Sequence, residues 1–141
     1  MPKFLNSRMG LRALALLAVA FGALTLKEGG GVLFGPGATR AAAGDYVPFV
    51  LWSNFLLGFA YVGAGLGLWL RQSWGLRLAA LILAITLATF VAFAVHVALG
   101  GDHETRTLVA MSLRTLVWGF ILLAARGLMR TLIRRSASSE S

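Results

Sequence analysis

Four polar side chains that stand inside or beside long apolar stretches are the best candidates for chemistry in this chain. They are Asn54, His96, Glu104 and Arg114. An amide, an imidazole and a guanidinium can donate hydrogen bonds to carbonyl or anionic oxygens, and a carboxylate can accept them. Counting along the apolar stretches places all four at a similar depth. We therefore predict that these residues line one polar, ligand-binding pocket.

Other chemistries find little support in the sequence. The chain has no cysteine, which excludes thiol chemistry and cysteine-ligated metals. His103 lies between Asp102 and Glu104, but these residues do not have the spacing of a known ligand set, so no metal site is predicted. Ser112 has no neighbouring base to activate it, and no catalytic residue is predicted. The histidines share one loop region, which disfavours a bis-histidine haem site, whereas single ligation of haem by His96 stays open.

The elements that would position these residues are membrane-spanning helices. Of the 141 residues, 58% are hydrophobic and only 13% are charged, which excludes an ordinary soluble domain of this size. A bilayer core about 30 Å thick needs about 20 apolar residues per helix. Four stretches approach or meet this length: residues 11–26, 47–70, 78–99 and 108–128. The sequence predicts an all-α fold, an integral membrane four-helix bundle formed by a single domain, residues 1–141.

Turn and capping residues separate the four stretches. Residues 27–45 are rich in glycine and other small residues and are predicted to form a loop. Asp45, Ser73 and Asp102 are placed to cap the following helices, and Gly100-Gly101 is placed to end the third. Residues 136–141 are predicted to be a disordered tail.

The distribution of basic residues predicts the orientation. Nine Lys and Arg residues fall on the side that holds both termini, and four fall on the other side or in the outer part of the last helix. The positive-inside rule therefore places both termini in the cytoplasm of a plasma or inner membrane, and places the predicted pocket in the outer leaflet. Topology accounts for the net charge of +8, so membrane lipids are expected partners and nucleic acid is not.

Small residues recur at helical spacing and are predicted to mediate helix packing. They are Ala80, Ala84, Ala88 and Ala92 on the third stretch, and Gly63 and Gly67 on the second. Such residues let membrane helices approach closely. The stripes favour either a tight bundle or a bundle that also packs against another integral membrane protein or a second copy of itself.

The layout resembles the DoxX-like family of small four-helix membrane proteins over about residues 11–128. The resemblance is carried by four short segments: Leu11-Arg12, Asn54-Phe55-Leu56-Leu57-Gly58, Leu68-Trp69-Leu70-Arg71 and Phe93-Ala94-Val95-His96. It implies a link to quinone-dependent oxidation of sulfur compounds and to membrane redox complexes. Members of that family often carry a carboxylate where this chain has Asn54, which weakens a proton-handling role at that position.

Three functional hypotheses follow. The first is an accessory or structural subunit of a larger membrane complex, respiratory or redox, with no catalytic activity of its own. The second is a redox membrane protein that binds a quinone, or haem, in the outer-leaflet pocket. The third is a small dimeric transporter, which is weakened because no acidic residue lies inside a predicted helix.

Overall fold

The protein is a bundle of four long helices and one short one. The computed structural model describes the backbone of residues 2–140 and the side chains of residues 6–140. The helices are α1 (Pro2–Phe34), α2 (Gly37–Ala43), α3 (Pro48–Trp69), α4 (Ser73–Ala98) and α5 (Thr105–Ser139). The four long helices contain segments long and apolar enough to cross a membrane, which confirms the all-helical, multi-pass membrane prediction.

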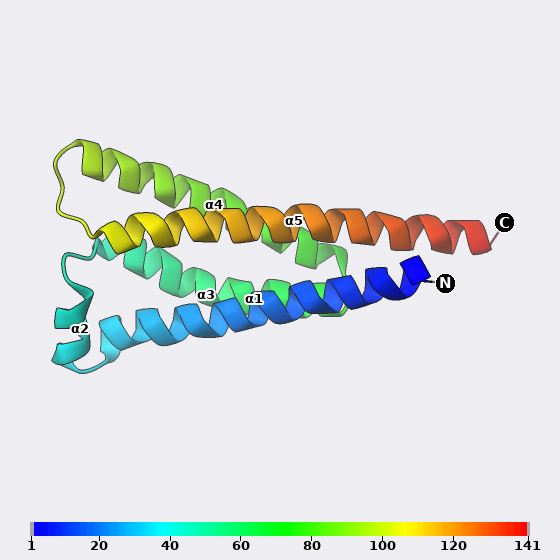
Figure 1. Ribbon diagram of the computed structural model, residues 1–141, viewed down its shortest axis with the longest axis horizontal. Coiled ribbons are helices and arrows are strands. Elements are labelled where there is room, and N and C mark those ends of the chain that lie inside the picture. Colours follow the sequence, from blue (N-terminus) through cyan, green and yellow to red (C-terminus); the bar gives the residue numbers. More distant parts are fainter. Residues whose placement is uncertain (1, 141) are drawn as a thin grey trace.

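The long helices form a ring in which each packs against the next. Helix α1 lies beside α3, α3 beside α4, α4 beside α5, and α5 beside α1. Both described ends of the chain lie at one end of the bundle, here called the terminal end, and α2 lies at the other, here called the α2 end (Figure 1). Helices α1 and α5 converge toward the terminal end and separate toward the α2 end (Figure 1).

Helices α1, α4 and α5 extend beyond the stretches predicted from sequence, whereas α3 matches its predicted stretch to within one residue at each end. Helix α1 continues through Gly29–Gly31 to Phe34, and α2 occupies most of the remaining predicted loop, so the prediction of a loop over 27–45 was wrong. A Cβ added at Gly29 would lie 3.3 Å from Cβ of Phe55, so this glycine lets α1 and α3 stay close. Helix α5 also continues to Ser139, so residues 136–139 are helical rather than a disordered tail, while Ser141 lies outside the described residues.

The helix caps also differ from the predicted ones. The residues before α3, α4 and α5 are Val47, Gln72 and Glu104, and none makes a side-chain capping bond. Pro48 starts α3, where its missing N–H has no helical partner to lose. At the other end of α4, Gly100 takes the left-handed conformation with φ of 82° and ends the helix as predicted.

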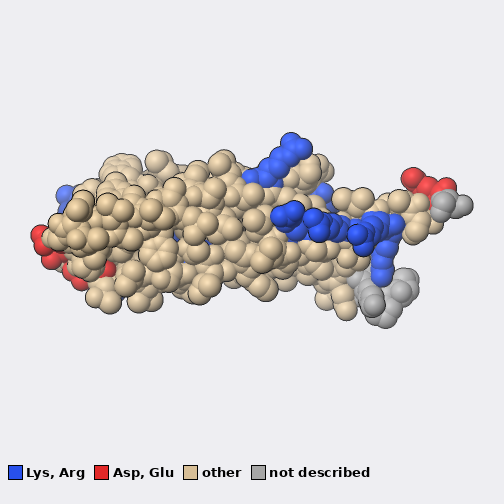
Figure 2. Space-filling model, turned by 90° about the horizontal axis from the view of Figure 1, so that it is seen from above, with Lys and Arg blue, Asp and Glu red and all other residues tan. Residues whose placement is uncertain are grey.

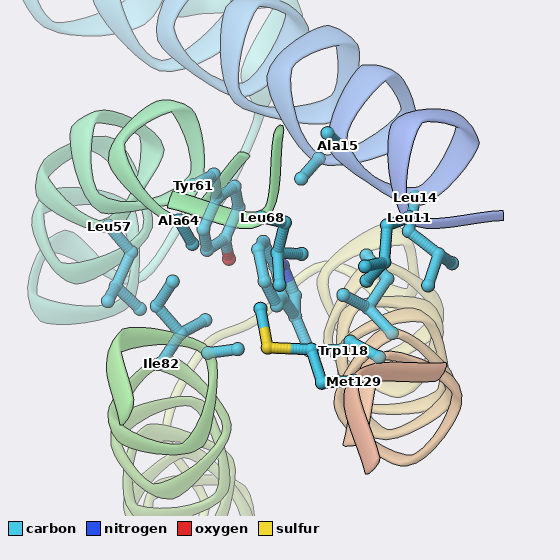
Figure 3. Packing of buried hydrophobic residues seen from close by; sticks show 14 residues of the cluster. Leu11, Leu14, Ala15, Leu57, Tyr61, Ala64, Leu68, Ile82, Trp118 and Met129 are labelled. Carbon is cyan, nitrogen blue, oxygen red and sulfur yellow. The ribbon is translucent and has the colours of Figure 1, made fainter. Parts of the chain in front are cut away.

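Glycine and alanine bring the helices together at several points. A Cβ added at Gly22 would lie 2.9 Å from the backbone oxygen of Gly58, and one at Gly67 would lie 2.6 Å from Cα of Gly75. The largest buried side chains fill the space between these contacts, and Figure 3 shows Tyr61 and Trp118 among them. Lipid supplies little hydrophobic drive for helix association, so close backbone approach and packing must hold the bundle together.

The charged residues are divided between the two ends. Figure 2 shows most of the visible Lys and Arg side chains toward the terminal end. The visible acidic side chains gather at the α2 end, apart from Glu140 at the tip of the chain. Arg12 stacks over the Trp69 ring at 5.2 Å from its centroid, which places this arginine with an aromatic residue near the terminal end.

Candidate functional site

The candidate site is a cavity of about 370 Å³ in the half of the bundle nearer α2. Helices α1, α3 and α5 supply its walls, and the α2–α3 connection lies at its mouth. Polar side chains line it at two levels: Glu28, Tyr46, Glu104 and Arg106 near the mouth, and Asn54 and Arg114 deeper in the bundle. The remaining walls are largely apolar and include Val32, Val50, Leu51 and Phe55.

Arg114 forms the deep end of this cavity. It lies nine residues after the start of α5, which corresponds to about 14 Å along the helix and therefore to a position well inside the bundle. Its Nε atom is buried and has no hydrogen-bond partner. Among residues 6–140 its guanidinium lies near the uncharged Tyr61 hydroxyl, and no carboxylate forms an ion pair with it. Among the described residues, Arg114 is therefore a cation with no carboxylate in ion-pair contact, although Glu28 and Glu104 line the same cavity nearer its mouth.

Asn54 lies beside Arg114 on the facing wall. Its side chain is only 7% exposed. Its Nδ2 donates to the sulfur of Met111 at 3.6 Å, and its Oδ1 is buried without a partner. A thioether is a weak acceptor, so this amide is poorly satisfied by the protein alone. Asn54 and Arg114 therefore both have unused hydrogen-bonding capacity.

Further unsatisfied groups continue from Arg114 into the core. The hydroxyls of Tyr61 and Thr86 and the indole N–H of Trp118 are buried without hydrogen-bond partners. The Tyr61 ring packs 4.8 Å from the Trp118 ring, and its hydroxyl points toward the centre of the bundle (Figure 3). Neither Tyr61 nor Thr86 was predicted from sequence, because tyrosine and threonine are common in membrane helices and their types alone do not show that they turn into the bundle.

Side chains near the mouth fasten α2 across the open end of the bundle. The Glu104 carboxylate accepts the backbone N–H of Asp45 at 2.9 Å, and Arg106 donates to the carbonyl of Ala42 at 2.9 Å. Arg40 donates to the carbonyls of Val32 at 3.2 Å and Leu33 at 3.0 Å. These bonds join α2 to both α1 and α5. We refer to residues 35–47, which they hold in place, as the strap.

His96 does not belong to the cavity. Its Nε2 lies 3.0 Å from the carbonyl oxygen of Asp102, and its ring packs edge-on against Phe49 at 6.1 Å. The histidine therefore fastens the α4–α5 connection. The prediction of one pocket containing all four residues was wrong for His96, because the cavity lies between α1, α3 and α5, away from this end of α4. His103 is exposed, and no group of three metal-binding side chains occurs among the described residues.

The predicted helix-packing residues fall into two groups. Gly67 is buried against Gly75 of α4, and Gly63 is half-buried with Leu78 as its neighbour. Ala80, Ala84, Ala88 and Ala92 are all exposed on the outside of the bundle. The face of α4 that turns inward instead carries Ala79, Ile82, Thr86 and Phe93. The alanine stripe therefore does not pack inside the bundle, and its alternative role as a contact with another protein stays a prediction.

No protein-family model, curated protein or solved structure matches this chain. The similarity to the DoxX-like family therefore stays a prediction, and the functional argument rests on the cavity itself.

Proposed function

We propose that this chain is a small ligand-binding membrane protein whose cavity takes the head group of a lipid-soluble molecule. The observation that carries the proposal is Arg114, a guanidinium deep in the bundle with a buried, unpartnered Nε and no carboxylate paired with it among residues 6–140. Buried polar groups without partners are costly, and such groups are expected to be satisfied by something. A ligand with acceptor oxygens supplies what Arg114 and Asn54 lack.

The shape and lining of the cavity support a lipid-soluble ligand. Its volume of about 370 Å³ lies in the range of small-molecule sites, which is about 300–1,000 Å³. Most of the wall is apolar, and the strap covers the end that would face water. A lipid-soluble ligand would reach such an apolar cavity from the bilayer rather than past the strap.

A quinone head group is one candidate of this class, and it is the ligand that the sequence resemblance implies. Its carbonyl oxygens would accept hydrogen bonds from the Arg114 guanidinium and from the Asn54 amide, so the residues present fit such a group. In the proposed topology both termini are cytoplasmic, which follows the excess of Lys and Arg at the terminal end. The cavity then lies in the half of a plasma or inner membrane that faces away from the cytoplasm.

The test is ligand-dependent stabilisation of the purified protein in a mild non-ionic detergent. A short-chain quinone should raise the midpoint of thermal unfolding, because a ligand that binds only the folded state stabilises it. Arg114→Gln should lose this response. Arg126→Gln, which removes an exposed arginine of α5 at the terminal end, is the matched control and should keep it. If neither quinones nor other amphiphiles stabilise the unmodified protein, the proposed function is wrong.

A second candidate function, an accessory subunit of a larger membrane complex, is favoured by the outward position of the alanine stripe. Ala80, Ala84, Ala88 and Ala92 lie on the exterior of α4, where small residues would let another membrane helix approach. Purification in mild detergent followed by mass spectrometry tests it. Stoichiometric larger membrane subunits would support the accessory role, and a protein that always purifies alone would oppose it.

A further inference from the structure

We propose that the head group bound in the cavity is negatively charged, and that the ligand is a single-chain anionic amphiphile such as a long-chain carboxylate. This inference rests on the proposed ligand-binding function and narrows it from any oxygen-containing head group to an anionic one.

The first argument is the charge balance at the deep end of the cavity. Arg114 brings one positive charge there, and its neighbours Asn54 and Tyr61 are uncharged. A neutral head group would satisfy hydrogen bonds but leave this charge uncompensated in a low-dielectric site. A carboxylate offers both a compensating charge and two acceptor oxygens that match the guanidinium fork.

Second, neither of the two acidic residues that line the cavity, Glu28 and Glu104, forms an ion pair with Arg114. Glu104 precedes the first residue of α5 and lies ten residues before Arg114, a separation of about 15 Å along the helix direction, and its carboxylate accepts the backbone N–H of Asp45 in the strap. Glu28 lines the cavity from α1 but forms no ion pair with Arg114 in the described structure. Neither acid therefore serves as the internal counter-ion of Arg114.

The third argument concerns the route by which an anion reaches Arg114. Glu28 and Glu104 line the mouth, with Arg106 as the one basic residue among the lining residues there, and the Arg106 guanidinium donates to Ala42. This arrangement disfavours free anions that arrive from water. An anion attached to a hydrocarbon chain can instead partition into the bilayer and place its chain against the apolar wall of Val32, Val50, Leu51 and Phe55. The occupant is therefore an amphiphile rather than an inorganic anion.

The experiment compares four probes on the full-length protein in a maltoside detergent at neutral pH. Dodecanoate has the chain and the charge, dodecanol has the chain alone, acetate has the charge alone, and a short-chain quinone is the neutral head group. Apparent affinities are obtained from the dependence of the unfolding midpoint on probe concentration. Charge-assisted hydrogen bonds are roughly twice as strong as neutral ones, so dodecanoate should bind at least about tenfold more tightly than dodecanol or the quinone.

Three variants connect the preference to Arg114. Arg114→Gln should reduce the advantage of dodecanoate over dodecanol to about twofold or less. Arg114→Lys keeps the positive charge and should still bind dodecanoate more tightly than dodecanol. This variant keeps the inference testable if Arg114→Gln does not fold. Arg126→Gln should match the unmodified protein, because it removes a charge at the other end of the bundle.

Each outcome has a distinct meaning. Equal binding of dodecanoate, dodecanol and quinone would overturn the anionic head group while leaving the ligand-binding function in place. If acetate binds as tightly as dodecanoate, the hydrocarbon chain contributes nothing, and the claim that the ligand is an amphiphile is wrong. Absence of binding by all four probes would overturn the proposed function together with this inference. A dodecanoate preference that persists unchanged in Arg114→Gln would show that the anion binds elsewhere and would also overturn the inference.

Discussion

Replacing Arg114 by leucine should make the ligand-free protein more stable. Insertion scales assign about +2.5 to +3.5 kcal/mol to arginine at the centre of a membrane helix and about −0.3 to −0.6 kcal/mol to leucine, a difference of about 3–4 kcal/mol for a fully lipid-exposed position. Arg114 is half-buried and faces the cavity, where water can partly solvate it. We therefore expect about half of that difference, a gain of about 1–2 kcal/mol.

The assay is unfolding of detergent-purified, delipidated protein, followed by the loss of helical circular dichroism, with and without dodecanoate. The leucine variant should be more stable than the unmodified protein in the absence of ligand and should not respond to dodecanoate. The unmodified protein should gain stability with the ligand and approach or exceed the variant. A leucine variant that is less stable without ligand would refute the reasoning, because Arg114 would then be a structural residue with a partner inside the bundle.

Three further outcomes are expected. Gly67→Val should destabilise the fold by at least about 2 kcal/mol in detergent unfolding, because a Cβ there would lie 2.6 Å from Cα of Gly75. If the variant is as stable as the unmodified protein, α3 and α4 do not cross at this point. Arg71→Gly should stabilise the α3–α4 turn by about 1 kcal/mol in the same assay, because Arg71 has φ of 56°, a conformation that glycine adopts at little cost. Ala84→Leu should reduce the size of any native complex on a native gel without affecting membrane insertion, and an unchanged size would count against the alanine stripe as an interface.

The helices could be predicted from sequence because apolar length alone identifies them, but their ends could not. Three successive glycines at 29–31 suggest a loop, since each costs about 1 kcal/mol relative to alanine in a helix interior. In the structure the packing of Gly29 against Phe55 of α3 offsets the low helix propensity of the glycines, and the helix continues to Phe34. Such compensation depends on a contact between distant segments, which the local sequence does not reveal.

Residue counting predicts how deep a polar residue lies along its helix, but not which side of the helix carries it. Counting residues placed Asn54 and Arg114 at neighbouring levels, and both line one cavity with Glu104. The same counting included His96, because it gives the depth of a side chain but not the side of the helix that carries it. One residue along a helix is a rotation of about 100°, and the inward face of α4 carries Gly75, Ala79 and Ile82 rather than the alanine stripe. Which side of a helix turns inward is set by its neighbours, so depth alone could not exclude His96.

Helix α5 runs without a break from the α2 end of the bundle to the terminal end. It passes the cavity at Arg114, contacts α1 where Leu128 meets Gly10, and ends in a segment with Arg130, Arg134 and Arg135. Measured along the helix axis from Leu128, Arg114 lies about 21 Å away in one direction and Arg135 about 11 Å away in the other, given a rise of about 1.5 Å per residue. Along this length Trp118, Ile121, Ala125 and Met129 of α5 are buried in the core. The residue that carries the proposed function and the basic end of the chain are thus parts of one continuous, packed helix.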